Sequence, residues 1–289
     1  MPSLKKAVIP VAGLGTRFLP MTKAQPKEML PLVDKPVIQY VVEEAARSHF
    51  KEFILITSEG KRSIENHFTP FPELEMLLNE KNKQDDIAQL HWINSLGQFT
   101  FVQQPKALGL GHAVLCAQEA VGNESFALLL GDDVFDPHDD SLDALLKAHQ
   151  VTGKSIVGVQ EVPREHVDRY GIINAPFPNK TPFWSVNQII EKPARESALS
   201  QWAVVGRYIL TPEIFRFLEC TRPSVGGEIQ LTSALESMAQ QGDLVACAIP
   251  AQRFDTGNKL DYVKASIEFA LKHPEIGAEV KKYLQSIRP

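Results

Sequence analysis

Strand-like and helix-like segments alternate through the first 160 residues, and this alternation limits the fold more than any other feature of the chain. Short apolar runs occur at 6–12, 52–58, 99–104, 125–133 and 154–162. Amphipathic stretches with helical spacing lie between them, at 36–48, 61–68, 111–121 and 141–150. Strands and helices that alternate in this way form βαβ units, so we predict an α/β fold with a mainly parallel sheet flanked by helices.

The pattern changes after residue 160. Three strand-like runs, at 170–176, 183–193 and 202–210, have no long helix between them. They predict a small antiparallel or mixed patch beside the sheet. Helices are predicted again at 211–220, 227–241 and 259–273, a strand at 243–249 and a last helix within 274–289. The charge-rich stretch 73–95 is an amphipathic insertion between sheet units, and no flexible linker divides the chain.

Charge and cysteine content exclude several kinds of function. The net charge of −5 disfavours sequence-independent nucleic-acid binding, which needs a basic surface. The three cysteines are scattered, which fits neither a disulfide framework nor a zinc site. No apolar run approaches the roughly 20 residues that span a membrane, and the N-terminus lacks the apolar core of a signal peptide. We therefore expect a cytoplasmic protein without a nucleic-acid or membrane partner.

The loop after the first strand begins like a dinucleotide-binding turn and then departs from it. Gly13 and Gly15 are present, but Phe18 takes the place of the third glycine, which argues against a dehydrogenase. Residues 1–27 hold five basic residues and no acidic one. These five are Lys5, Lys6, Arg17, Lys23 and Lys27. Two interpretations stay open for the three that lie in the loop, Arg17, Lys23 and Lys27: a clamp for a triphosphate, or a solvated surface loop.

Carboxylates follow two of the predicted strands. Asp132 and Asp133 come directly after the apolar run at 126–130, where hard oxygen ligands suit Mg²⁺ held with substrate phosphates. Asp255 lies in a turn that Thr256 or Asn258 caps at the start of a helix. Taken alone, Asp255 is better explained as a turn residue, and aspartates at 132 and 133 also suit a turn.

Two further stretches hold polar residues at element ends. Glu191 and Lys192 end a predicted strand just before Pro193, and taken alone they suit an exposed strand terminus. Gly109 and Gly111 lead into a helix at His112, where free amide groups suit an anion or a ribose. Glycines also simply make turns, and His112 suits a helix start better than a catalytic base.

Together these stretches resemble the sugar-1-phosphate nucleotidyltransferase family. The run "GLGTRFLPMTKAQPKEMLP" matches that family's signature, and "LLGDDV", "IIEKP", "VVGRYIL" and "RFDTGNKLDYVKA" follow in the family's order. The chain resembles in particular the bacterial uridylyltransferases that act on UTP and glucose 1-phosphate. Two departures are Ser233 and Thr256, where the family often has Asp and Cys. Neither position is assigned to the chemistry.

The resemblance implies a Rossmann-like mixed fold, Mg²⁺, and formation of UDP-glucose and pyrophosphate. We expect one domain over 1–289, with a mainly nucleotide-binding part at 1–160, a mainly sugar-binding part at 161–272 that includes the antiparallel patch, and a helical tail at 273–289. The family is often dimeric or tetrameric, so a homodimer or homotetramer is expected.

The resemblance also assigns roles to residues. Arg17, Lys27 and Lys192 take the catalytic, phosphate-binding positions, and Asp132 and Asp255 the metal positions. The other implied residues contact the nucleotide (Ala12, Gly13, Glu28, Gln104 and Gly109) or the sugar (Gly171 and Glu191, with Lys192).

The chemistry requires no enzyme nucleophile, because the sugar phosphate is already ionised at pH 7. It can displace pyrophosphate in line at the α-phosphorus, so positioning and cationic stabilisation supply most of the catalysis. Three alternatives stay open: a transferase for dTTP or CTP, one for another sugar 1-phosphate, and a non-catalytic regulatory protein that binds nucleotide sugars. The intact set of charged residues favours an enzyme.

Overall fold

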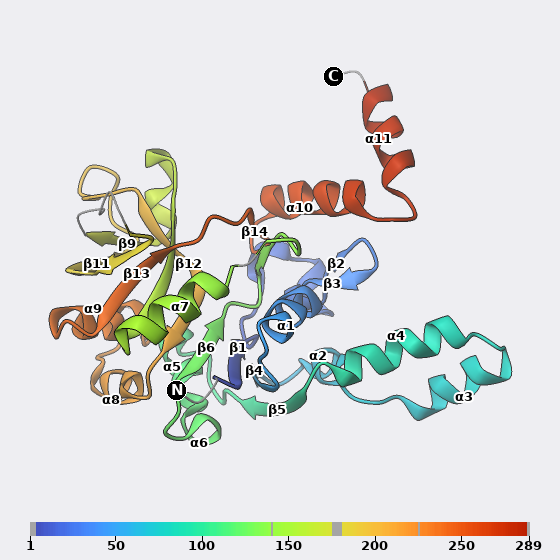
Figure 1. Ribbon diagram of the computed structural model, residues 1–289, viewed down its shortest axis with the longest axis horizontal. Helices are drawn as coiled ribbons and strands as arrows, with labels where there is room; N and C mark the ends of the chain where they lie inside the picture. Colours follow the sequence, from blue (N-terminus) through green and yellow to red (C-terminus); the bar gives the residue numbers. More distant parts are fainter. Residues whose placement is uncertain (1–3, 140, 175–180, 225, 288–289) are drawn as a thin grey trace.

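A ten-stranded mixed sheet forms the centre of the molecule (Figure 1). The computed structural model describes residues 4–139, 141–174, 181–224 and 226–287. The strands are β1 (Lys6–Pro10), β4 (Glu52–Thr57), β5 (Gln98–Gln103), β6 (Phe126–Leu129), β8 (Ser155–Glu161), β9 (Gly171–Asn174), β10 (Phe183–Ser185), β11 (Gln188–Glu191), β12 (Trp202–Leu210) and β13 (Leu244–Ala248). Their order is β10-β13-β8-β12-β6-β1-β4-β5, with β9 attached to β12 and β11 attached to β9.

The first half of the chain forms the predicted parallel sheet. Strands β5, β4, β1 and β6 are neighbours and all run in the same direction. The intervening helices are α1 (Val37–Arg47), α2 (Arg62–His67), α5 (Gly109–Cys116), α6 (Gln118–Val121) and α7 (Asp143–Thr152). The mainly parallel α/β fold is therefore confirmed. Parallel strands end at one edge, so the loops after β1, β5 and β6 lie together there.

Helices cover both faces of the sheet. In β1, Ala7 and Ile9 point to one core layer and Val8 to the other, as the period of two in a strand requires. The first layer packs against α1, α7 and α10 (Lys259–Lys272). The second packs against α5, α8 (Glu213–Cys220) and α9 (Leu231–Gln240). All four residues of β6 are buried, as its apolar sequence predicts.

The strand β12 joins the two halves of the sheet. It lies between β6 and β8 and is antiparallel to both. Its first residues extend past the carboxyl end of β6, and there Ala203 pairs with Ile172 of β9. The antiparallel pair β9–β11 is the expected patch, whereas 202–210 belongs to the main sheet. The run 183–193 is two strands with different partners, because β10 pairs with β13 and β11 with β9.

Two small antiparallel pairs bring distant segments together. The strands β7 (Asp133–Phe135) and β14 (Arg253–Asp255) pair so that Asp133 lies opposite Asp255. The strands β2 (Pro31–Leu32) and β3 (Lys35–Pro36) form the other pair. The helix predicted from residue 227 begins only at Leu231. The backbone of Ile229 is bound to the start of α5 instead, because its N–H donates to the carbonyl oxygen of Leu108 and its carbonyl oxygen accepts from the N–H of Gly111.

Two helical segments extend away from the sheet. The predicted insertion forms a hairpin of α3 (Pro72–Glu80) and α4 (Gln84–Ser95), and α11 (Gly277–Ser286) continues outward from α10 (Figure 1). No residue of α3 or α4 is buried, and Met76 and Trp92 are exposed there. Within the described ranges, no helix is both long and apolar enough to cross a membrane. The homodimer or homotetramer stays a prediction.

Candidate active site

The loop after β1 contains no α-helix that could hold a phosphate at its N-terminus. Three short 3₁₀ turns follow one another instead: η1 (Thr16–Phe18), η2 (Met21–Lys23) and η3 (Lys27–Met29). This loop therefore offers an anion side chains and not the N-terminus of an α-helix. Arg17 lies 3.5 Å from the carbonyl oxygen of Gly257, whereas Lys23 forms no ion pair among the described residues.

Lys27 connects this loop to the acidic loop after β6. Its Nζ donates a hydrogen bond to Oδ2 of Asp132 and lies 4.0 Å from Oε1 of Glu28. Burial would lower the pKa of Lys27, but the charges of Asp132 and Glu28 outweigh burial and raise it. Lys27 therefore stays a cation.

Asp132 and Asp255 converge at Gly257. A Cβ atom on Gly257 would lie 2.6 Å from Oδ2 of Asp132 and 3.0 Å from Oδ1 of Asp255, so only glycine fits. Thr256 holds the two segments together, because its N–H and Oγ1 both donate to the carbonyl oxygen of Asp132 (2.9 and 2.6 Å). Asn258 caps α10, as one of the sequence-based alternatives predicts.

The two carboxylates suit a divalent metal that substrate also ligates. Among the described residues, no cluster of three or more His, Cys, Asp or Glu side chains is arranged around a metal position. Mg²⁺ commonly takes one or two carboxylates and completes its shell with water and phosphate oxygens. Burial would raise the pKa of Asp132, but Lys27 and Arg17 hold it below the ordinary value, so this carboxylate is ionised. The donor set therefore fits Mg²⁺.

Sequence reasoning named Asp133 beside Asp132 but missed the buried partner of Asp133. Asp133 is buried and pairs with Arg253, at 2.8 Å between Oδ1 and Nη1. Burial raises the pKa of Asp133 to about 6, Arg253 opposes that rise, and Asp255 and Asp132 add to it. The guanidinium of Arg253 lies over the ring of Tyr170, 4.9 Å from the centroid. Nothing in the sequence marks Arg253, since only the β7–β14 pairing places it here.

The patch β9–β11 contributes a second charged group. Oε2 of Glu191 accepts a hydrogen bond from Thr232 (2.6 Å), and Lys192 Nζ lies 3.4 Å from its Oε1. Lys192 has a φ of 45°, so the chain leaves the extended conformation of the strand at this residue. The side chains of Glu191 and Lys192 can therefore face the same site, which neighbours within a strand cannot do. A Cβ atom on Gly171 would lie 3.4 Å from Oε2 of Glu191 and 3.6 Å from Thr232, so the main chain of Gly171 lies close to this hydrogen-bonded pair. Thr232 is another residue that the sequence did not indicate.

A cavity of about 200 Å³ lies where these groups meet. Half of the twelve predicted site residues line it: Arg17, Asp132, Gly171, Glu191, Lys192 and Asp255. Residues that were not predicted line it too, among them Tyr170, Thr232 and Arg253. The structure thus brings cations, carboxylates and the β9–β11 patch to one place.

The remaining predicted residues lie along the ends of β1 and β5. Ala12 is buried directly after β1, and Gly13 lies next to the side chain of Lys27. Glu28 is buried and pairs with Lys61 at 2.8 Å. Burial raises the pKa of Glu28 although Lys61 and Lys27 oppose the rise.

Gln104 and Gly109 are in direct contact beside this group. Gln104 follows β5, and its side-chain Nε2 donates to the carbonyl oxygen of Gly109 at 3.1 Å. The N–H of Gly111 donates to Ile229, so this amide is not available to a ligand. Of the two glycines predicted to offer a free amide N–H to a ligand, Gly111 is therefore excluded and Gly109 stays a candidate.

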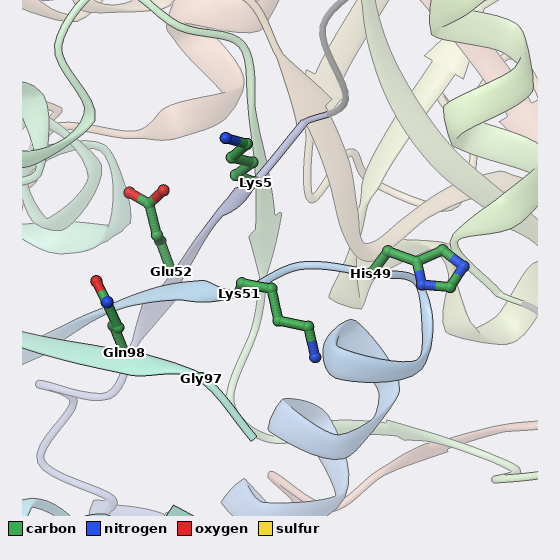
Figure 2. Close-up of a pocket in the computed structure, with 6 residues that line it drawn as sticks. All are labelled: Lys5, His49, Lys51, Glu52, Gly97 and Gln98. Atoms are coloured by element: carbon green, nitrogen blue, oxygen red, sulfur yellow. The ribbon is translucent and has the colours of Figure 1, made fainter. Parts of the chain in front are cut away.

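A larger cavity, of about 470 Å³, lies at the opposite edge of the sheet. Lys5, Glu52 and Gln98 line it at the amino ends of β1, β4 and β5 (Figure 2). Figure 2 shows the side chains of Lys5 and Lys51 pointing away from each other. No predicted site residue lies there, so cavity size does not identify the site.

Comparisons with known proteins agree with this geometry. Residues 6–271 match the family described as "Nucleotidyl transferase". The chain is 46% identical over 287 residues to a UTP–glucose-1-phosphate uridylyltransferase from Staphylococcus haemolyticus, with 99% of each chain covered. A relative from Staphylococcus saprophyticus, UTP–glucose-1-phosphate uridylyltransferase 2, is 44% identical, with 100% of this chain and 99% of that one covered.

Solved structures show the same similarity. A UTP-bound UGPase from Acinetobacter baumannii superposes with a TM-score of 0.91 at 40% identity, covering 99% of this chain and all of that one. A UDP-glucose pyrophosphorylase complexed with UDP-glucose gives 0.85 at 39% identity, covering 93% and 100%.

Proposed function

This chain belongs to the nucleotidyl transferase family, and we propose that it transfers the uridylyl group of UTP to glucose 1-phosphate, forming UDP-glucose and pyrophosphate. One observation carries the proposal. Arg17, Lys192 and the carboxylates of Asp132 and Asp255 line a single cavity between the ends of the parallel strands and the β9–β11 patch. A nucleotide and a sugar phosphate would meet there.

The reaction transfers the uridylyl group from pyrophosphate to the sugar phosphate, and it needs no proton transfer from the enzyme. A phosphate oxygen of glucose 1-phosphate attacks the α-phosphorus of UTP, and the bond to the β-phosphate oxygen breaks as pyrophosphate leaves. Two anions must approach each other, so catalysis consists of positioning and charge stabilisation. We assign Arg17 to the leaving pyrophosphate, Lys27 to the nucleotide phosphates and Lys192 to the sugar phosphate.

Asp132 and Asp255 would hold Mg²⁺. The metal would neutralise charge on the nucleotide phosphates when bound. Lys27 already contacts Asp132, so it lies where it can bind a phosphate that approaches this carboxylate.

The remaining contacts divide between the two substrates. Ala12, Gly13, Glu28, Gln104 and Gly109 would contact the uracil and ribose. Gly171 and Glu191 would contact the glucose in the cavity, where Gly171 lies beside the hydrogen bond between Thr232 and Glu191. The hydrogen bond from Thr232 keeps one oxygen of Glu191 fixed.

The decisive experiment replaces two cations that line the cavity. We expect Lys192→Ala and Arg17→Ala each to lower kcat/KM by about 100-fold or more, as loss of a charge-stabilising group does. Lys192→Ala should also raise the KM for glucose 1-phosphate. Pyrophosphate release measures both effects, and circular dichroism confirms the fold.

Lys23→Ala is the matched control, because Lys23 lies in the same loop as Arg17 and is exposed like it, but Arg17 lines the cavity and Lys23 does not. Its activity should stay close to that of the parent chain. The assignment is wrong if Lys192→Ala and Arg17→Ala both keep full kcat/KM. A panel of four nucleoside triphosphates with glucose 1-phosphate tests the preference for UTP.

A further inference from the structure

The side-chain amide of Gln104 is held in one orientation by its neighbours. The backbone N–H of Gln104 donates to the carbonyl oxygen of Thr57 (2.8 Å), which anchors the residue at the edge of the sheet. Its side-chain Nε2 lies 3.1 Å from the carbonyl oxygen of Gly109 and 3.0 Å from Nδ1 of His112. Two different groups therefore contact the same end of the amide.

The chemistry of these partners determines whether the NH₂ group or the oxygen of the Gln104 amide faces them. A backbone carbonyl oxygen only accepts hydrogen bonds, so the amide group that faces Gly109 must be the NH₂ group. Its second hydrogen then points to Nδ1 of His112, which must accept it. His112 is consequently neutral when it makes this contact, with its proton on Nε2.

The amide oxygen is left free for a ligand. Gln104 is only 7% exposed, yet its Oε1 has no hydrogen-bond partner among the described residues. Oε1 is also absent from the buried polar atoms of those residues that lack a partner, so it reaches the surface. Gln104 therefore offers an acceptor, and not a donor, to whatever binds beside it.

We propose that His112 is a positioning residue for base selection, which keeps the oxygen of Gln104 turned toward the nucleobase. This inference rests on the proposed function, in which Gln104 contacts the base. Uracil carries a hydrogen on N3 and can donate to Oε1, whereas N3 of cytosine is an acceptor and would face that oxygen unpaired. A buried acceptor without a donor costs binding energy, so UTP is selected over CTP.

A purely structural role for His112 predicts a different result. His112 lies in the first turn of α5, and the Sγ atom of Cys116 is 3.9 Å from its Nδ1. If His112 only supported this helix, its loss would lower stability and activity with every nucleotide alike. The ratio of kcat/KM for UTP to that for CTP separates the two roles.

The test compares His112→Phe, which keeps a ring but has no acceptor, with His112→Asn, which keeps an acceptor. In His112→Phe the UTP/CTP ratio should fall about tenfold, the effect of one lost hydrogen bond, because Gly109 alone then holds the amide. His112→Asn should recover much of the ratio. Cys116→Ala, which touches His112 but not Gln104, is the control and should leave the ratio unchanged.

Three outcomes separate the hypotheses. If the parent chain releases no pyrophosphate from UTP and glucose 1-phosphate, the proposed function fails. If it does so but His112→Phe keeps the UTP/CTP ratio, only the role of His112 is overturned. If His112→Phe does not fold, His112→Ala, which removes the acceptor without added bulk, is measured instead.

Discussion

Gly257 shows how closely the site is packed around its carboxylates. Its Cα lies so near Asp132 and Asp255 that a methyl group would displace one or both of them. The main chain of Gly257 also takes part, because its N–H donates to Oδ1 of Asp255 at 3.0 Å. The geometry of the proposed metal position thus depends on Gly257, although this residue has no side chain.

We therefore expect Gly257→Ala to lower kcat by about 100-fold and to raise the Mg²⁺ concentration needed for half-maximal rate. Titration of the initial rate with Mg²⁺ measures both. Gly153→Ala is the control, since Gly153 has a left-handed backbone in open space and its loss costs about 1 kcal/mol of stability away from the site. An Mg²⁺ dependence for Gly257→Ala equal to that of Gly153→Ala would exclude this role for Gly257.

The sequence was enough to propose roles for single residues, but it did not give the distances between them. Asp132 was recognisable because it follows an apolar strand, and Lys27 because its loop is basic. Asp255 by itself favoured a turn, and only the family resemblance raised it to a metal ligand. Its proximity to Asp132 comes from the β7–β14 pairing, which no local pattern encodes.

Arg207 of β12 ties three elements together from the interior. It is completely buried and pairs through two nitrogens with Glu44 of α1, at 2.8 and 2.6 Å. The same guanidinium donates to the carbonyl oxygen of Asp133 at 2.7 Å. Helix α1, strand β12 and the loop that carries the acidic pair are therefore held by one side chain.

Removing the charge of Glu44 should destabilise the whole fold. Glu44→Gln leaves the buried cation of Arg207 uncompensated, so we expect the free energy of unfolding to fall by about 3 kcal/mol. Urea denaturation gives the value. Glu73→Gln, at an exposed position on α3, should change it by less than about 0.5 kcal/mol. Equal effects of the two substitutions would show that the buried pair adds nothing.

Element types were predicted better than element partners. The strand β6 and the helix α1 follow from apolar runs and helical spacing, and both occur where expected. The sequence pattern predicts one strand over 183–193, whereas the structure has two strands there. The two halves of the run pair with different neighbours. Partners depend on long-range packing, which periodicity does not contain.

An ion pair between β7 and α10 makes the stability of the molecule depend on pH. Asp136 follows β7, and its carboxylate accepts hydrogen bonds from Lys272, in the last turn of α10, and from the N–H of His138. Burial would raise the pKa of Asp136, but Lys272 and His138 hold it below the ordinary value. A lowered folded-state pKa adds stability above the ordinary pKa, and this stability is lost as the pH falls through the folded-state value.

The parent chain should therefore exceed Asp136→Asn in stability by about 1 kcal/mol at pH 7, and the difference should begin to shrink near pH 4 and vanish below the folded-state pKa of Asp136. Denaturation midpoints at a series of pH values test this. Asp243→Asn, at an exposed position outside any helix and without an ion pair among the described residues, is the control. A constant difference for Asp136→Asn would contradict the assignment.

The central place of β12 also constrains the order in which the chain can assemble. Both sheet neighbours of β8, namely β12 and β13, lie later in the sequence. A nascent chain that ends near residue 161 can pair β1, β4, β5 and β6, but it leaves β8 without a partner and one side of β6 open. Such edges invite aggregation, and long-range pairings form slowly. The first half of the chain, which carries the loop after β1, is therefore exposed to misassembly during synthesis until β12 has emerged.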